Sequence, residues 1–276
     1  MRIATVNVNG IRAAARKGMG EWLASSAPDI LLLQEVRADE QIAVDLLPGY
    51  EAAIWPCRIK GRAGVGVAVR EGGPATLGEL RYGVAAPGTE EPDVDSGRWL
   101  EADLSLTGFD GFERLTVISA YLHSGQLGTE KMDQKYAHLE LVDARMAELL
   151  AAARDGGPQV VMAGDLNVVR SERDIKNWKP NHNKIAGVMD EEIAHLEGWF
   201  ASGWIDVARW LAPGEQGPYT WWSQRGKAFD NNTGWRIDYQ VLTPALADRA
   251  HSVTVDRAPD YASRWSDHAP LVVEYR

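Results

Sequence analysis

The most constraining feature of this sequence is a set of short apolar segments that each end in polar side chains. The apolar residues 160–163, VVMA, lead into Gly164, Asp165 and Asn167. In an extended chain, side chains two residues apart lie on the same face, so we expect Asp165 and Asn167 to point together. Catalytic groups are commonly mounted in this way at the ends of rigid strands. The segment is therefore predicted to be a strand that delivers a polar pair to a site.

The same pattern recurs from one end of the chain to the other, and we expect the clusters to assemble into one site. Because no linker separates them, residues 1–276 are predicted to form a single domain. The stretch 83–97, rich in Gly, Pro and acidic residues, is predicted to be a surface loop rather than a domain boundary. The other clusters are Asn7 with Asn9, Gln34 with Glu35, Tyr121 with His123, Asp238, and Asp267 with His268.

Extended and helical patterns alternate along the chain in a mixed order. Units of a strand followed by a helix are interspersed with hairpin-like pairs of strands. This mixture favours an α/β fold with two sheets over a single parallel sheet. Helices are predicted over residues 11–27, 39–47, 130–154 and 191–200, and strands over 64–69, 99–106, 115–121 and 270–273.

The charge and cysteine content narrow the class of protein. A net charge of −10 disfavours a protein that grips DNA by overall attraction, but not an enzyme with a local basic patch. Basic residues between 170 and 184, and the pairs Lys131 with Lys135 and Arg225 with Lys227, are either phosphate contacts or ordinary solvated faces. Cys57 is the single cysteine, so no intramolecular disulfide is available. With no apolar leader or membrane span, we expect a cytoplasmic protein.

The polar clusters supply mainly carboxylate and amide groups, with one imidazole at His268. Hard oxygen ligands suit Mg²⁺, which usually takes one or two protein carboxylates and fills its shell with water and substrate phosphate. A carboxylate base, a histidine and a hard cation together fit the attack of water on a phosphoester. General acid–base catalysis supplies about 10²–10⁴-fold, whereas phosphoester hydrolysis needs a barrier lowered by on the order of 20 kcal/mol. Metal and hydrogen-bond stabilisation must therefore supply most of the acceleration.

Five motifs, in this order, resemble the exonuclease III and abasic-site endonuclease family of the endonuclease/exonuclease/phosphatase superfamily. They are TVNVNGIR at 5–12, LQE at 33–35, GDLN at 164–167, GWRIDY at 234–239 and SDHAP at 266–270. Each motif alone is weak, but together they cover nearly the whole chain. The resemblance implies a four-layer α/β sandwich like that of deoxyribonuclease I. In it, two mixed β-sheets pack face to face, flanked by helices, with the site at one sheet edge.

The resemblance also implies a role for each cluster. Glu35 would be the principal ligand of Mg²⁺, with Mn²⁺ as the alternative ion, and Asn7, Asp165 and Asp267 would support the metal. Asp165 would also deprotonate the attacking water, in a geometry fixed by Asn167. The remaining catalytic groups would be His268 at the scissile phosphate, Asp238 setting the tautomer of that histidine, and Tyr121 at the leaving group.

Aromatic residues suggest how a substrate would be selected. Trp221 and Trp235 match family positions that line a slot for an extruded abasic deoxyribose, and a sugar without its base is easily flipped out. Against this, most tryptophans are simply core residues. Further substrate contacts are expected at Asn9, Arg225 and Lys176.

The chain departs from the family at two places. Leu122 and His123 follow Tyr121 where the family has an aromatic or β-branched residue and then proline, so His123 is either a neighbour of the site or a loop bystander. At Asn9 some relatives carry Asp, so we do not assign direct metal ligation there.

The function implied is that of a Mg²⁺-dependent DNA-repair phosphodiesterase. It would incise duplex DNA on the 5′ side of abasic sites and would act as a 3′–5′ exonuclease that also removes blocking groups from 3′ ends. The expected partner is double-stranded DNA, and the expected state is a monomer. One alternative is a phosphoesterase acting on a phospholipid or inositol phosphate head group, which would need a different pocket. Another is a catalytically inactive binding module, against which the intact catalytic clusters argue.

Overall fold

The computed structural model describes residues 1–85 and 88–276, and within these residues the strands form two six-stranded sheets. The first sheet contains β1 (Arg2–Asn7), β2 (Ile30–Gln34), β3 (Tyr50–Trp55), β4 (Val65–Arg70), β11 (Ala250–Val255) and β12 (Leu271–Tyr275), in the order β11-β12-β1-β2-β4-β3. The second contains β5 (Ala75–Tyr82), β6 (Trp99–Leu106), β7 (Arg114–Tyr121), β8 (Gln159–Asp165), β9 (Ile205–Asp206) and β10 (Asp238–Leu242), in the order β5-β6-β7-β8-β10-β9.

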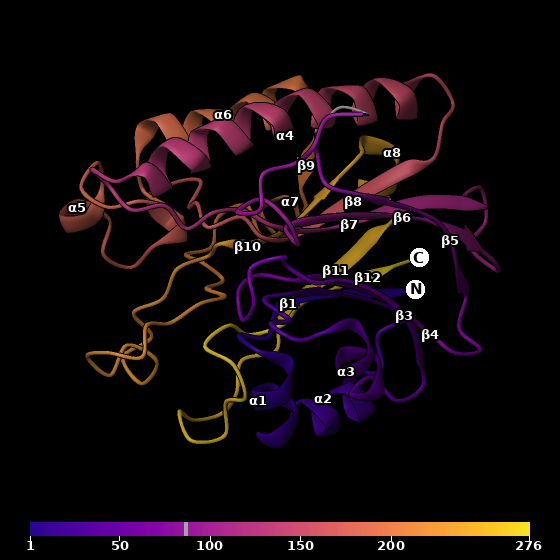
Figure 1. Cartoon of the computed structure of the whole chain (residues 1–276), viewed down its shortest axis with the longest axis horizontal. Coiled ribbons are helices and arrows are strands. Elements are labelled where there is room, and N and C mark those ends of the chain that lie inside the picture. Colours follow the sequence, from indigo (N-terminus) through magenta and orange to yellow (C-terminus); the bar gives the residue numbers. More distant parts are fainter. Residues whose placement is uncertain (86–87) are drawn as a thin grey trace.

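Helices cover the outer face of each sheet, so the molecule has four layers (Figure 1). The first sheet is covered by α1 (Ile11–Arg16), α2 (Met19–Ser26) and α3 (Glu40–Asp45), and the second by α4 (Glu130–Arg154) and α6 (Asp190–Ser202). The expected sandwich of two mixed sheets flanked by helices is confirmed. Shorter helices are α5 (Trp178–Asn181), α7 (Val207–Leu211), α8 (Pro244–Ala247) and the 3₁₀ helix η1 (Glu172–Asp174). Among the described residues, every helix is too short or too polar to span a lipid bilayer.

The central strands are apolar on both faces because each face meets a different layer. In β1, Ile3 packs between the sheets, whereas Ala4 and Val6 pack against the helices outside. Strands buried on both sides are near-continuous apolar runs, as these are. Each large apolar side chain buried in this way stabilises the fold by roughly 1.5–3 kcal/mol. The strands that carry the polar clusters are therefore held rigidly from both sides.

Local predictions fail where glycine or burial changes the pattern. The helix predicted over residues 11–27 is two helices, because Gly18 adopts a φ of 114° between them. Strands β3, β5 and β11 were not predicted. The stretch 83–97 is only partly a surface loop, since Glu91 and Asp95 are buried. Residues 86 and 87 of this stretch lie outside the described part of the chain.

Strand pairing explains why the polar clusters meet. β1 runs parallel to β2, and β7 parallel to β8, so in each sheet two carboxyl ends emerge at the same edge. β10 runs antiparallel to β8, which places its first residue, Asp238, opposite Asp165. Tyr121 also lies opposite Asp165 in the register of β7 and β8. Gly164 permits this close pairing, because a side chain there would collide with the backbone carbonyl of Ala120.

Candidate active site

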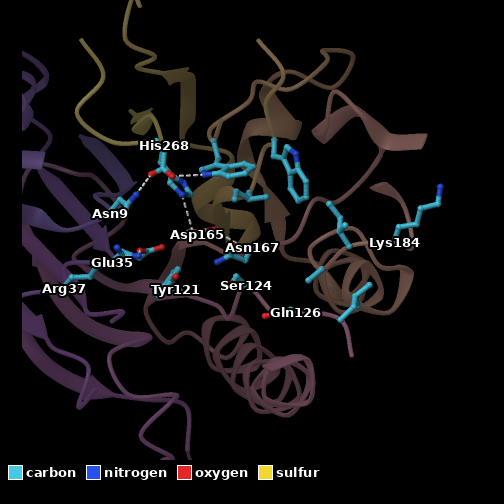
Figure 2. A pocket seen from close by; sticks show the side chains of 18 residues that line it. Asn9, Glu35, Arg37, Tyr121, Ser124, Gln126, Asp165, Asn167, Lys184 and His268 are labelled. Carbon is cyan, nitrogen blue, oxygen red and sulfur yellow. Dashed lines mark hydrogen bonds and ion pairs between the residues drawn. The ribbon is translucent and has the colours of Figure 1, made fainter. Parts of the chain in front are cut away.

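A cavity of about 690 Å³ opens where the polar ends of the two sheets meet (Figure 2). Figure 2 shows Glu35, Tyr121, Asp165 and His268 turned toward one common space. Polar clusters from distant parts of the sequence thus converge, as predicted. The predicted site residues that line the cavity are Asn9, Glu35, Tyr121, Asp165, Asn167, Trp221, Trp235, Asp267 and His268.

A buried chain of two carboxylates and one imidazole reaches the cavity at Asp165 and His268. Nδ1 of His268 lies 2.8 Å from Oδ2 of Asp238, and its Nε2 lies 3.7 Å from Oδ2 of Asp165. Burial raises the pKa of Asp165 to about 7, although His268 opposes the shift. Burial alone would lower the pKa of His268, but Asp238 and Asp165 raise it to about 10. The acidic neighbours thus favour the protonated ring, which Asp238 orients through Nδ1 so that Nε2 lies on the side of Asp165.

Asn7 lies beneath the cavity and joins the two principal acidic groups. Its Nδ2 donates to Oε1 of Glu35 and to Oδ2 of Asp165, both at 2.9 Å. Its Oδ1 accepts from the backbone N–H of Asn9 at 2.9 Å. Asn7 therefore orients the two carboxylates. The second lone pair of its Oδ1 is not used by this hydrogen bond, and the support of a metal by Asn7 stays a prediction.

The second oxygen of Glu35 fits a bound cation. Among the described residues, Oε2 of Glu35 is buried and receives no hydrogen bond of normal geometry, although it contacts the guanidinium of Arg37. The contact with Arg37 shows that this oxygen takes a cation as its partner, and carboxylate oxygens are the ligands that hard divalent ions prefer. Glu35 also has a φ of 50°, a strained value for a residue that is not glycine, and such strain is typical of functional sites. The donor set around Glu35 therefore suits a hard divalent ion.

The carboxylates of Asp165 and Asp238 and the imidazole of His268 also lie close enough together to hold a metal ion. We favour the Glu35 side, because Nδ1 of His268 is already occupied by Asp238 and so is not free to bind a metal ion. A cation beside Glu35 would still lie near Asp165, since Asn7 bridges the two carboxylates.

Asp267 is another carboxylate that lines the cavity, beside Asn9 and Trp221. It accepts from Nδ2 of Asn9 at 2.8 Å and from Nε1 of Trp221 at 3.2 Å. Burial alone would raise the pKa of Asp267, but His268 and these hydrogen bonds hold it below its ordinary value. Asp267 is thus a fixed negative charge within the cavity, consistent with supporting a metal or its waters.

Tyr121 and Asn167 border Asp165 on the second sheet. The backbone N–H of Asn167 donates to Oδ1 of Asp165, and Nδ2 of Asn167 donates to the carbonyl of Leu122, both at 2.9 Å. Burial, and then the carboxylates of Glu35 and Asp165, hold the pKa of Tyr121 well above its ordinary value. The phenol therefore remains a proton donor at physiological pH.

An aromatic wall lies beside the acidic groups. The rings of Trp221 and Trp235 meet edge to face with centroids 5.6 Å apart, and Ile237 lines the cavity beside them. Trp222, by contrast, is buried away from the cavity and bonds Asn232. The cavity therefore combines a charged half with an apolar half.

Arg225 and Lys176 do not line the cavity. Arg225 is exposed in a loop, and Lys176 lines a separate depression with Trp178 and Lys179. Their contact with a long substrate stays a prediction. Lys135 is fully buried, so both interpretations of it, as a phosphate contact and as part of a solvated face, are wrong.

The structure decides between the two interpretations of His123 and adds Arg37 to the residues of the site. His123 is a loop residue outside the cavity, because its ring is buried and hydrogen bonded to Asp95 at 2.6 Å. Arg37, which lines the cavity and contacts Glu35, was missed. Its position two residues after Glu35 was the available signal.

A two-sheet sandwich with an acid–imidazole cluster at one edge defines a hydrolase built for phosphoesters. The chain belongs to the Endonuclease/Exonuclease/phosphatase family, whose sequence profile matches residues 4–268.

Individual relatives agree with this assignment. An exodeoxyribonuclease of Bacillus subtilis (strain 168) is 32% identical over 273 residues, covering 98% of each chain. A DNA-(apurinic or apyrimidinic site) endonuclease of Dictyostelium discoideum is 29% identical over 276 residues, covering 99% of this chain and 70% of that protein. The solved structure of the 3′ phosphatase NExo from Neisseria, bound to a product DNA hairpin, superposes with a TM-score of 0.80 at 26% identity, covering 100% of this chain and 99% of that one. The resemblance drawn from the motifs is confirmed, as is the nuclease class that it implies.

Proposed function

We propose that this protein is a metal-dependent DNA-repair nuclease that cuts duplex DNA on the 5′ side of abasic sites and trims or cleans 3′ ends. The observation that carries the proposal is the Asp165–His268–Asp238 chain lying between the carboxylate of Glu35 and the aromatic wall of the cavity. The names and activities of the relatives, which act on abasic sites and 3′ ends, support the same substrate.

Asp165 is the proposed general base. Both of its oxygens are held in place, and burial raises its pKa above the ordinary carboxylate value, which makes it a better proton acceptor. The N–H groups of Asn167 and Asn7 hold its two oxygens, so a water placed in the cavity would meet a fixed acceptor. Attack by this water would transfer one proton to Asp165 and would break the phosphoester bond on the opposite side of phosphorus.

His268 and Tyr121 are the proposed contacts to the phosphate and the leaving group. The His268 cation, fixed by Asp238, would hold a non-bridging phosphate oxygen through its Nε2–H. Tyr121, kept protonated by burial and by its acidic neighbours, would donate a hydrogen bond toward the leaving oxygen.

We further propose that Mg²⁺, or Mn²⁺ as the alternative ion, is held by Glu35 with support from Asp165 and Asp267. When bound, the ion would neutralise charge that accumulates on the phosphate. Asn7 would contribute by fixing the orientation of the carboxylates.

The aromatic half of the cavity is the proposed selector for base-free nucleotides. A deoxyribose that still carries its base would have to displace Trp221 or Trp235, whereas an abasic deoxyribose would fit against them. Trp235→Ala is expected to lower the ratio of cleavage at abasic sites to cleavage of intact duplex by about tenfold, because the filtering surface is removed. Parallel kinetics on the two duplexes measure this ratio. Trp210→Ala, which alters an exposed tryptophan outside the cavity, is the matched control; an unchanged ratio in Trp235→Ala contradicts the slot.

The primary test is metal-dependent cleavage of a duplex with one abasic site. We expect cleavage on the 5′ side, loss of cleavage in EDTA, and recovery when Mg²⁺ is restored. Turnover of an inositol phosphate or a phospholipid head group, measured beside it, separates this proposal from the other activity considered for the superfamily. Faster turnover of either of those substrates than of DNA would overturn the proposal.

We also propose that the chain acts as one domain and as a monomer in the cytoplasm. Residues from Asn7 to His268 of a single chain build the cavity, so no second copy is needed to complete it. The single cysteine suits a reducing compartment. Size-exclusion chromatography with light scattering tests the monomeric state.

A further inference from the structure

A buried ion pair lies behind the wall of the cavity and takes no part in the chemistry described above. Lys135 of α4 and Glu192 of α6 are both fully buried, and Nζ of Lys135 lies 2.5 Å from Oε1 of Glu192. Burying two opposite charges is rarely a net gain in stability over well-packed apolar residues. The pair therefore calls for an explanation other than stability.

The ammonium of Lys135 reaches two backbone segments that border the active site. Its Nζ donates to the carbonyl of Asn167 at 2.9 Å and approaches that of Ser124 at 3.5 Å. The ammonium is thus engaged by one carboxylate, through an ion pair, and by two backbone carbonyls. Asn167 follows β8 and orients Asp165, while Ser124 begins a segment after β7 that lines the cavity.

The carboxylate of Glu192 reaches a third segment. Its Oε2 accepts from the backbone N–H of Gly187 at 2.6 Å and of Met189 at 3.1 Å. Residues 184–186, immediately before them, line the cavity. Gly187 packs so closely that a Cβ there would lie 2.8 Å from the carbonyl oxygen of Asn167 and 3.2 Å from Trp235.

We propose that the Lys135–Glu192 pair is a positioning unit that sets these three wall segments relative to one another and so fixes Asp165 through Asn167. The segments are irregular, and buried backbone groups in irregular segments need partners from elsewhere. Lys135 supplies donors for the carbonyls of two segments, and Glu192 supplies an acceptor for the N–H groups of the third. The inference rests on the proposed nuclease function only for its effect on rate.

The double variant Lys135→Met with Glu192→Gln tests the proposal without leaving a buried charge unpaired. A displacement of about 1 Å at a catalytic group can lower a rate by on the order of 10²-fold. We therefore expect the single-turnover rate on an abasic duplex to fall by about 10–100-fold, with a smaller change in KM. Arg145→Met is the matched control, because Arg145 also lies on α4 and pairs with the buried Glu101, away from the cavity. It should change the rate by no more than about twofold.

A second measurement needs no substrate. Amide hydrogen exchange in segments 122–129 and 183–189 should accelerate by at least about tenfold in the double variant and stay unchanged in Arg145→Met. If the double variant exchanges faster but the unmutated protein does not cut DNA, the nuclease proposal is refuted and the positioning role stands. If the exchange and cleavage rates of the double variant both equal those of the unmutated protein, the positioning role is overturned. If the double variant fails to fold, the more conservative pair Lys135→Gln with Glu192→Gln carries the test, and unchanged exchange in both segments would overturn the proposal.

Discussion

Two buried ionic clusters meet at one short segment of the chain and differ in how their charges balance. Arg236 donates from Nε to Asp174 at 2.6 Å and from Nη1 and Nη2 to Asp206 at 3.0 and 2.8 Å. Arg209 adds a second cation to Asp174 at 2.6 Å. Two residues after Arg236, Asp238 enters the catalytic cluster with His268 instead.

In the Arg236 cluster, the cations determine the protonation state of the acids. Burial alone would raise the pKa of Asp174, but Arg236 and Arg209 hold it below its ordinary value. In the catalytic cluster the opposite occurs, since burial and neighbouring acids raise the pKa of Asp165 to about 7. Among the described residues, His268 and Arg37 are the cations that contact its four carboxylates, Glu35, Asp165, Asp238 and Asp267.

The difference in charge balance distinguishes a cluster that stabilises the fold from one that takes part in catalysis. A balanced cluster needs nothing more from outside, and it locks the segment around Trp235 and Asp238 in place. An acidic cluster with too few cations attracts a metal ion and keeps one carboxylate able to accept a proton. Without a bound metal ion, repulsion among these carboxylates should lower the stability of the fold.

The largest effect expected from this contrast is on catalysis. Asp165→Asn should lower the single-turnover rate on an abasic duplex by about 10³–10⁴-fold, or roughly 4–5.5 kcal/mol, because the amide accepts no proton. Affinity for the duplex should change only a few-fold, and the melting temperature should stay level or rise, because an under-compensated charge is removed. Quench-flow kinetics and calorimetry measure the two effects. Asp206→Asn, in the balanced cluster, should instead lower the melting temperature with little change in rate, and the reverse result for either variant would break the comparison.

The next effect is on stability. Arg236→Met should destabilise the fold by about 3–5 kcal/mol, because Asp174 and Asp206 would be left as buried carboxylates without their main partner. In a protein of this size we expect the melting temperature to fall by roughly 6–15 °C. Calorimetry of Arg2→Met is the control, since that side chain pairs with Glu274 at the partly exposed surface and should matter by less than about 1 kcal/mol. Equal melting temperatures for the two variants would show that the balanced cluster is not structural.

Much of the site could be predicted from the sequence because strand ends are local features. Asp165 and Asn167 follow an apolar run, and two-residue spacing places them on one face whatever the rest of the fold does. The resemblance of the motifs to a known family then implied the four-layer arrangement. That residues of different strands, such as Tyr121 and Asp165, belong to one site was implied by the resemblance rather than by any local pattern.

What could not be predicted depends on contacts between distant segments. Lys135 reads as one more surface lysine on an amphipathic helix, and only the packing of α6 against α4 reveals its partner, Glu192. Arg236 is inside a catalytic motif, yet its partners Asp174 and Asp206 come from two separate elements, η1 and β9. The break at Gly18 was missed because glycine inside a helical pattern is often tolerated.

The smallest effect concerns a third way of handling a buried carboxyl, which is to protonate it. Glu91 accepts from the N–H of Val84, and burial raises its pKa to about 7. Because the folded pKa exceeds the ordinary value of 4.5, the stability from this group is present below about pH 4.5 and is lost as pH rises through 7. Glu91→Gln should therefore stabilise the protein at pH 8 by about 1–2 kcal/mol relative to pH 5. This is less than the roughly 3 kcal/mol that the full shift would give, because solvent screens the group in part.

Melting temperatures of Glu91→Gln and of the parent, measured from pH 5 to pH 8, check this sign. Glu90→Gln is the matched control, because Glu90 is the adjacent carboxylate and is exposed to solvent. The difference between Glu91→Gln and the parent should grow with pH, whereas the difference for Glu90→Gln should stay flat. A gain for Glu91→Gln that is largest at pH 5 would mean that this carboxyl is ionised and paired in the folded protein. It would then belong with Asp174 in the balanced class, and proton uptake would not be a separate way of burying an acid here.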